Sequence, residues 1–174
     1  MFNEKWDVLD ENGRRTGKTT LRRKCILKSG EYHLVVHIWI VSTDGRVLLQ
    51  RRSEHKKLMP GEWAATGGAA VSGEDSFTAA KRELHEELGI RSDEQSLKKL
   101  SRIKRRNSLV DMWAITVDPE SCALKLQKSE VAEAKWITLP EFKNMIENKQ
   151  FHNYGKEYFD TLFSELEKMN TVLA

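Results

Sequence analysis

The sequence predicts a single domain of the mixed α/β (α+β) class. The first observation is a series of runs rich in β-branched and aromatic residues, the clearest being HLVVHIWIV at 33–41, and such runs are typical of strands. The second is a pair of segments, 76–88 and about 139–170, in which apolar residues recur three and four positions apart, as in helices that face a core. The third is continuity. No repeat, low-complexity run or linker divides the chain, so we assign residues 1–174 to one domain.

Composition excludes several classes of protein. With 39% hydrophobic and 32% charged residues, the chain is typical of globular rather than disordered proteins. A formal net charge of +3 is too small to indicate a nucleic-acid partner, and none is expected. No apolar run approaches membrane-spanning length and the first residues lack a signal-peptide layout, so we expect a cytoplasmic protein without a membrane partner. Cys25 and Cys122 lack metal-type spacing, which indicates incidental or buried thiols.

The N-terminal residues, about 4–20, are predicted to form a β-hairpin. Two short strand-like segments flank the turn sequence DENG at 10–13. The apolar run at 33–41 follows, as expected of a strand that is buried on both faces. A turn at 43–45 then leads into VLLQRR at 47–52, which we expect to pair with that strand.

A basic cluster lies at the end of this second strand. Its members are Arg51, Arg52, His55, Lys56 and Lys57. Charged side chains where a strand gives way to a loop often lie at the mouth of a site, and guanidinium groups match phosphate oxygens. We therefore take Arg51, Arg52 and Lys57 as candidates for binding an anionic substrate. A solvated loop is the alternative, and the residues alone favour neither.

The helix at 76–88 has well-marked ends. Capping residues and acidic side chains precede it at 72–76, which favours a helix start. Phe77, Ala80, Leu84 and Leu88 then form an apolar stripe that predicts packing on a core. Gly89 follows the last of these residues, where a left-handed C-terminal cap is expected.

The same helix carries three glutamates, Glu83, Glu86 and Glu87, on a face that we expect to be distinct from its apolar stripe. Like charges at this spacing destabilise a helix unless they are neutralised. Arg82 can pair with Glu86 one turn away, but it cannot serve three carboxylates. A divalent cation could, and oxygen ligands of this type suit Mg²⁺ or Mn²⁺. An ordinary solvated acidic face is the alternative.

Two further strands are predicted after the helix. The segment 97–106 is rich in lysine and arginine and shows the alternation of an exposed strand, so a solvated basic edge is the default interpretation and binding of a nucleotide tail or RNA the alternative. In the strand at 108–117, Asp111 and Trp113 share a face. Trp113 either packs in the core or stacks on a base.

The C-terminal part, about 139–170, is predicted to be helical. Pro140 lies in the first turn of one helix, a favourable position for proline. Apolar residues from Tyr154 to Leu166 form a strong stripe, which packs either on the sheet or on a second subunit, so a homodimer stays open.

One stretch resembles a known motif. Gly68, Glu74, Arg82, Glu83, Leu84, Glu86, Glu87, Gly89 and Ile90 reproduce the Nudix box over residues 68–90 without a departure. The flanking hairpin, LLQRR at 48–52 and PGEW at 60–63 are similar to the branch of the Nudix superfamily that includes isopentenyl-diphosphate isomerase. The likeness spans roughly residues 4–145.

The resemblance implies a Nudix fold, in which a mixed β-sheet is sandwiched between helices and the box at 68–90 forms a loop-helix-loop. It implies that Glu83, Glu86 and Glu87 bind Mg²⁺ or Mn²⁺ and help to activate water, and that Arg82 orients a glutamate. Gly68, Glu74 and Gly89 are then structural. The implied reaction is hydrolysis of a diphosphate linked to another group, usually in a nucleoside diphosphate derivative.

The segment at 130–136 resembles the one that leads into the last strand of the family. A glutamate there sometimes acts as an additional ligand or as the general base. Glu130 is the candidate for this catalytic role, and Glu133 is the alternative. The expected partner is a small-molecule diphosphate, and the sequence does not identify it.

Two other functions fit the sequence less well. An isomerase of the related branch needs a cysteine and a histidine where this chain has Gly67 and Ala69, and neither of these side chains can transfer a proton. His33 alone, which fits the place of a metal-binding histidine in that enzyme, does not restore the site. The other function is a Nudix-like module that binds a nucleotide without cleaving it, but such a module has no need of three adjacent carboxylates.

Overall fold

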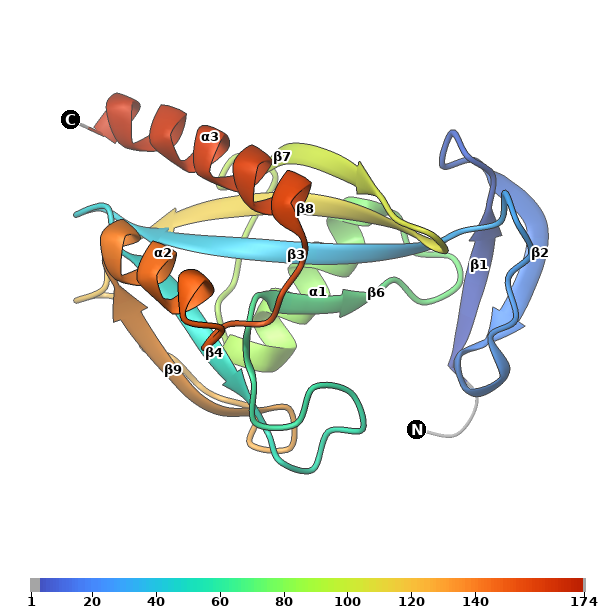
Figure 1. Cartoon of the computed structure of the whole chain (residues 1–174), viewed down its shortest axis with the longest axis horizontal. Coiled ribbons are helices and arrows are strands. Elements are labelled where there is room, and N and C mark those ends of the chain that lie inside the picture. Colours follow the sequence, from blue (N-terminus) through green and yellow to red (C-terminus); the bar gives the residue numbers. More distant parts are fainter. Residues whose placement is uncertain (1–3, 174) are drawn as a thin grey trace.

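A mixed β-sheet forms the centre of the molecule, and a two-stranded hairpin lies at one end of it (Figure 1). The computed structural model describes residues 4–173 of the chain, with side chains up to Met169. The central strands β3 (His33–Ser42) and β8 (Ser108–Val117) run parallel, in register from His33 opposite Ser108 to Ser42 opposite Val117. The remaining pairs are antiparallel, so the sheet is mixed.

The strands lie in the order β5-β4-β3-β8-β7, with β6 paired to β3 and β9 paired to β4. Their bounds are β4 Val47–Arg52, β5 Trp63–Ala64, β6 Thr66–Ala69, β7 Leu97–Lys104 and β9 Val131–Ile137. The strand predicted at 47–52 is confirmed, and it pairs with β3 as expected.

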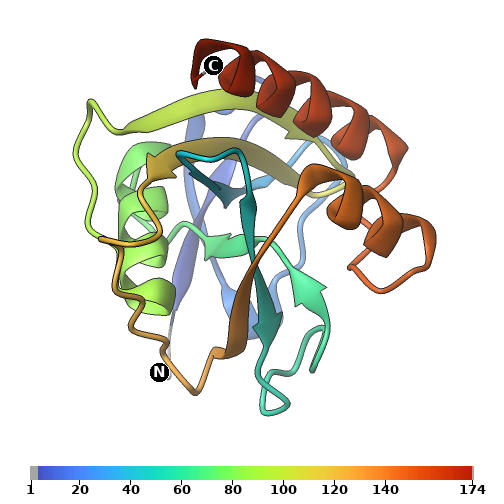
Figure 2. The same cartoon turned by 90° about the vertical axis from the view of Figure 1, so that its left-hand side faces the viewer.

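Helices cover both faces of the sheet (Figure 2). Helix α1 (Ser76–Leu88) lies on one face, and α2 (Leu139–Glu147) and α3 (Lys156–Leu173) lie on the other. Because successive side chains of a strand point to opposite faces, Ile38 and Ile40 of β3 pack with α1, while Trp39 and Val41 pack with α2 and α3. The predicted α+β class, with a sheet between helices, is therefore confirmed.

Helix α1 begins and ends where the sequence predicts. The Asp75 side chain caps it by accepting a hydrogen bond of 2.7 Å from the Thr78 amide. Gly89 takes the left-handed conformation, with φ +74°, and its amide donates to the His85 carbonyl at 2.9 Å. The apolar stripe between these caps packs in the core, with Leu84 and Leu88 fully buried.

The hairpin consists of β1 (Lys5–Leu9) and β2 (Arg15–Leu21), followed by a short 3₁₀ turn at Arg22–Lys24. It is joined to the main sheet in two ways. Leu9 packs with Tyr32 and Leu109 in a small apolar cluster. The backbones of Leu9 and Tyr32 also exchange two hydrogen bonds, of 2.7 and 2.9 Å.

The C-terminal stripe packs on the sheet of its own chain. Tyr158, Leu162 and Leu166 of α3 are buried in the same core as Trp39. Of the two arrangements that the sequence left open, the structure therefore shows packing on the sheet. None of the helices within residues 4–173 has the length and apolar character needed to cross a membrane.

Trp113 is a core residue. It is 8% exposed, packs against Phe77 of α1, and donates a hydrogen bond of 2.9 Å to Ser76 Oγ. The basic edge strand β7 is only partly solvated, because Lys99 and Arg102 bind the buried carboxylate of Asp111 at 2.7 and 2.5 Å. These contacts hold the pKa of Asp111 below its usual range although burial opposes the shift.

Candidate functional site

The predicted acidic cluster lies where helix α1 meets strands β4 and β6. Gly67 and Gly68 of β6 pair with His37 and Val36 of β3, which brings the start of the box against the sheet. The chain then loops through 70–75 and enters α1. As a result, the carboxylates in the second half of α1 lie beside the glycines at which the loop begins.

Arg82 links the loop to the glutamates. Its Nε and Nη2 donate to the two carboxylate oxygens of Glu74 at 2.7 and 2.9 Å. Its Nη1 donates to Glu83 at 2.8 Å and to Glu86 at 3.2 Å, the contact one turn away that the sequence predicts. Its Nη2 also reaches the Ala69 carbonyl at 3.3 Å. The hydrogen bonds with Glu74 raise the pKa of Arg82 above its ordinary value, so the guanidinium is a permanent cation of the cluster.

Glu87 is the most buried of the three glutamates, with 3% of the residue exposed. The expectation that the acidic face is separate from the buried side of α1 is therefore wrong for this residue, because α1 ends against β4 and β6. Gln50 Nε2 donates to Glu87 Oε2 at 2.8 Å, and the Gly67 amide donates to the same oxygen at 2.9 Å. Burial, together with the charge of Glu83, raises the pKa of Glu87 to about 8.

Glu83 and Glu86 differ in exposure. The side chain of Glu83 is 13% exposed and that of Glu86 is 49% exposed. Burial raises the pKa of Glu83, and the charges of Glu86 and Glu130 add to that effect, while Arg82 opposes it. The helix thus presents a graded series of carboxylates, from buried Glu87 to half-exposed Glu86.

The donor set matches a hard divalent cation in chemistry. Carboxylate oxygens are the ligands that Mg²⁺ and Mn²⁺ prefer, and burial, with a smaller effect of neighbouring carboxylates, raises the pKa values of Glu83 and Glu87, which makes their ionisation unfavourable without a cation. Within residues 4–173, however, no three acidic, histidine or cysteine side chains converge at distances that would hold a metal ion. Glu83 and Glu86 turn toward Arg82, and Glu87 turns toward Gln50.

Of Glu130 and Glu133, it is Glu130 that interacts electrostatically with this cluster, since its charge contributes to the raised pKa of Glu83. Lys56 forms an ion pair with the Glu130 carboxylate, and the Glu130 carbonyl accepts a hydrogen bond of 2.9 Å from the Ser53 amide. Glu133 instead forms an exposed ion pair with Arg51 at 3.3 Å.

The three basic candidates have different surroundings. Arg52 is 8% exposed, its Nε donates to the Leu58 carbonyl at 3.1 Å, and its charge partly opposes the rise in the pKa of Glu87. Arg51 is engaged by Glu133 and, at 3.5 Å, by Glu54. Lys57 is exposed. Of these three, Arg52 is the residue whose charge acts on Glu87.

Two glycines of β6 lie in close contact with neighbouring residues. Gly67 has φ +141°, and a Cβ atom there would lie 2.0 Å from the Val36 carbonyl oxygen. A Cβ atom at Gly68 would lie 2.5 Å from Glu83 Oε1. Gly67 is thus needed for the close approach of the loop to the backbone of β3, whereas at Gly68 the flexible end of the Glu83 side chain would have to shift.

Two contact residues were not predicted from the sequence. Gln50 holds Glu87, and the signal that could have found it is an uncharged polar side chain directly after the apolar residues VLL at 47–49 of a predicted buried strand. Lys56, rather than its predicted neighbour Lys57, pairs with Glu130. No feature of the basic cluster distinguishes these two lysines, because their environments depend on a loop without regular structure.

Comparison with known proteins identifies the family. The sequence model of the NUDIX domain matches residues 31–160. A relative from Listeria monocytogenes, named as an uncharacterized Nudix hydrolase, is 38% identical over 152 residues, which cover 87% of this chain and 89% of the relative. An isopentenyl-diphosphate Delta-isomerase of Streptomyces griseus is 38% identical over 85 residues, which cover 48% of this chain and 43% of that enzyme.

The fold is shared with solved structures. A crystal structure of a protein from Deinococcus radiodurans matches with a TM-score of 0.75 at 22% identity and covers 86% of this chain and 93% of that one. The box, the sheet with helices on both faces and the sequence relatives agree. The chain belongs to the Nudix hydrolase family, whose members generally hydrolyse nucleoside diphosphate derivatives and use divalent metal ions.

Proposed function

We propose that this protein hydrolyses a diphosphate bond in a nucleotide-derived small molecule, by attack of water on phosphorus, with Mg²⁺ or Mn²⁺ as cofactor. The observation that carries the proposal is the carboxylate charge that Glu83, Glu86 and Glu87 bring to the second half of α1, where Glu83 and Glu87 are largely buried. Burial raises the pKa of both groups, and neighbouring carboxylates raise it further. A divalent cation held by these oxygens would compensate that charge.

Glu83, Glu86 and Glu87 are the residues that would hold the ion. When bound, it would screen the charge of the diphosphate and polarise the phosphorus. Arg82 keeps Glu83 and Glu86 on one side of the helix, and Glu74 fixes Arg82 in turn. Gly68 and Gly89 have structural roles, since one lets the loop approach Glu83 and the other ends the helix.

Glu130 is the proposed general base. A carboxylate beside the acidic cluster can take the proton from the attacking water, and the ion pair with Lys56 holds this one in place. Its influence on the pKa of Glu83 supports Glu130 over Glu133, which is engaged by Arg51.

Arg52 is the basic residue best suited to bind the substrate. It is nearly buried, and no salt bridge to it is found within the part of the chain that the structure describes, so its remaining N–H groups can serve phosphate oxygens. Arg51 and Lys57 would act at the outer edge of the site, where Arg51 would have to leave Glu133.

The lack of room for a side chain at Gly67 argues against the isomerase alternative. The cysteine that such chemistry needs would fall on this residue, where a side chain would overlap the Val36 carbonyl. An assay with isopentenyl diphosphate tests this directly, and metal-dependent formation of dimethylallyl diphosphate would overturn the exclusion.

Turnover of a substrate panel tests the proposed function. The panel contains nucleoside diphosphate sugars, dinucleoside polyphosphates, nucleoside di- and triphosphates, coenzyme A and NADH, each with Mg²⁺ or Mn²⁺. The expected result is metal-dependent release of a phosphate or nucleotide product from at least one member. Tight nucleotide binding without any product would favour the non-catalytic binding module instead.

Two properties of the whole chain are part of the same proposal. Residues 1–174 are taken as one domain, supported by the apolar cluster that joins Leu9 of the hairpin to Leu109 of the central sheet. A cytoplasmic location is supported by Cys25 and Cys122, which form no disulfide.

A further inference from the structure

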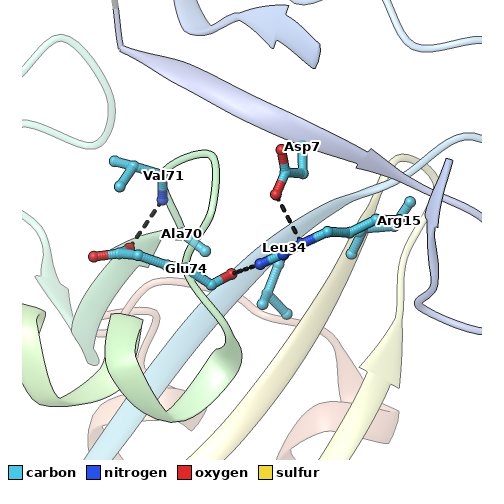
Figure 3. Close-up of a pocket in the computed structure, with 7 residues that line it drawn as sticks. Asp7, Arg15, Leu34, Ala70, Val71 and Glu74 are labelled. Carbon is cyan, nitrogen blue, oxygen red and sulfur yellow. Dashed lines mark hydrogen bonds and ion pairs between the residues drawn. The ribbon is translucent and has the colours of Figure 1, made fainter. Parts of the chain in front are cut away.

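The N-terminal hairpin contacts the box although it lies before the segment that matches the Nudix family. The match begins at residue 31, whereas β1 and β2 span Lys5–Leu9 and Arg15–Leu21. These strands form their own two-stranded sheet and do not extend the central one. Their side chains nevertheless reach the loop that precedes α1 (Figure 3).

Asp7 holds the first half of this loop. Its Oδ1 accepts a hydrogen bond of 2.6 Å from Ser72 Oγ, and its Oδ2 accepts one of 3.0 Å from the Gly73 amide. The Ser72 amide also donates to the Lys5 carbonyl at 2.8 Å. The Asp7 side chain is 17% exposed, although both of its hydrogen bonds to the loop lie at the exposed surface.

Arg15 holds the second half. Its Nη2 donates to the Glu74 carbonyl at 2.9 Å, and its Nε forms an ion pair of 2.9 Å with Asp7 Oδ2. Figure 3 shows Arg15 reaching between Asp7 and Glu74. Asp7 and Arg15 thus bind each other and form hydrogen bonds with three successive loop residues, Ser72, Gly73 and Glu74.

The contacts continue from the loop into the site. The Glu74 carboxylate accepts from the Val71 amide at 3.0 Å and from Arg82 at 2.7 and 2.9 Å. Arg82 in turn donates to Glu83 and Glu86. An unbroken chain of hydrogen bonds and ion pairs therefore leads from the hairpin to two of the box carboxylates.

The space between these residues is too small for a ligand. The cavity that Asp7, Arg15 and Glu74 help to line has a volume of about 20 Å³, which is room for about one water molecule. The hairpin also has an attachment that does not involve Asp7, because Leu9 packs against Tyr32 and exchanges two backbone hydrogen bonds with it. The contacts of Asp7 and Arg15 therefore serve the loop rather than a bound molecule or the docking of the hairpin.

We infer that Asp7 and Arg15 are positioning residues of the active site. They fix the loop at 72–74, so that Glu74 holds Arg82, and Arg82 in turn restrains Glu83 and Glu86, two of the residues proposed to bind the cation. The inference rests on the proposed function, because it assigns these residues a role in cation binding at the same site. Side chains that support catalytic groups in this way set their geometry, and small displacements of such groups lower turnover strongly.

Four variants test the inference. Asp7→Ala removes both acceptors, Asp7→Asn keeps one acceptor oxygen, and Arg15→Ala removes the contact with Glu74. Lys18→Ala is the matched control, because Lys18 lies on the same strand as Arg15 and forms an ion pair of 2.9 Å with Glu31, away from the loop. Thermal unfolding of all four checks that each variant is folded.

Three measurements follow on the folded variants. Hydrogen exchange of the Gly73 amide is measured on metal-free protein, Mn²⁺ affinity by electron paramagnetic resonance without substrate, and kcat and KM on the substrate that the panel identifies. For Asp7→Ala and Arg15→Ala we expect faster exchange, Mn²⁺ binding weakened roughly 3- to 10-fold, and kcat lowered roughly 10-fold with KM nearly unchanged. Asp7→Asn should be intermediate, and Lys18→Ala should match the wild type.

A double-mutant cycle tests the route through Glu74. If Asp7 acts through this residue, Asp7→Ala and Glu74→Gln together should weaken Mn²⁺ binding by less than the product of their separate effects. Multiplicative effects, or Asp7→Ala and Arg15→Ala variants that bind Mn²⁺ like Lys18→Ala, would overturn the inference. A wild-type protein that binds Mn²⁺ but cleaves no member of the panel would instead overturn the proposed hydrolysis, and the Mn²⁺ comparison would still decide the positioning role.

Discussion

Replacing Glu87 with glutamine is expected to stabilise the metal-free protein at alkaline pH while removing its metal-dependent activity. The substitution keeps the size of the side chain and its hydrogen bonds. One carboxylate oxygen of Glu87 accepts from both Gln50 Nε2 and the Gly67 amide, and an amide oxygen can accept the same two bonds. What the substitution removes is the ability to carry a negative charge in a buried place.

The size of the effect follows from the pKa of Glu87, which burial and the charge of Glu83 raise from the ordinary 4.5 to about 8. The folded state therefore binds this proton more tightly than the unfolded state. Its contribution to stability is complete below about pH 4.5 and is lost as the pH rises through about 8. Since one pKa unit corresponds to about 1.4 kcal/mol, ionised Glu87 costs the metal-free fold on the order of 5 kcal/mol.

The assay is thermal or urea unfolding in EDTA at about pH 5 and about pH 9. At the lower pH the wild type and Glu87→Gln should differ by about 1 kcal/mol or less. At the higher pH the variant should be more stable by roughly 2–5 kcal/mol, which raises Tm by at least about 5 °C in a chain of this size. Adding Mn²⁺ should raise Tm of the wild type more than that of the variant.

Glu86→Gln is the matched control for this experiment. It replaces a glutamate of the same helix face whose side chain is 49% exposed, so its stability at the higher pH should stay within about 0.5 kcal/mol of the wild type. A Glu87→Gln variant that is no more stable than the wild type at about pH 9 would refute the argument that Glu87 is a buried, uncompensated charge. Metal-dependent turnover at the wild-type rate in this variant would remove Glu87 from the proposed ligands.

Three further outcomes are expected. Arg82→Lys keeps the positive charge but loses the guanidinium group that joins Glu74, Glu83 and Glu86. In this variant kcat should fall about 10-fold or more and Tm should fall by a few degrees, and wild-type values in both measurements would contradict the role of Arg82. Glu130→Gln should lower kcat roughly 100-fold in steady-state assays, whereas Glu133→Gln should leave kcat within about 2-fold, and the reverse order would exchange the two residues. Gly67→Cys should destabilise the protein by about 2 kcal/mol or more in urea unfolding, because its Cβ would overlap a backbone carbonyl, and a variant as stable as the wild type would show that the loop can move aside.

Much of the fold follows from local chemistry. Helix α1 was predicted from its capping residues, apolar stripe and Gly89, and it spans Ser76–Leu88 as expected. The run at 33–41 was predicted to be buried on both faces, and β3 lies between two helical layers. Such features depend on neighbours a few positions apart, which is why a single sequence contains them. The contact of Arg82 with Glu86 was predictable for the same reason, since the two residues lie four positions apart on one helix.

The sequence alone determined the box, its helix, the identity of the acidic side chains and the absence of the isomerase cysteine and histidine. Only the tertiary structure decided how these side chains differ from one another. Glu87 is buried and Glu86 is half exposed because β4 and β6 cover just one end of the helix face, and that depends on the packing of strands distant in sequence. The different surroundings of Glu130 and Glu133, the ion pair of Lys56 with Glu130, and the contact of Asp7 with the box loop likewise depend on the tertiary structure. Burial and electrostatic coupling arise from residues far apart in the chain, whereas the spacing of residues describes only what is near.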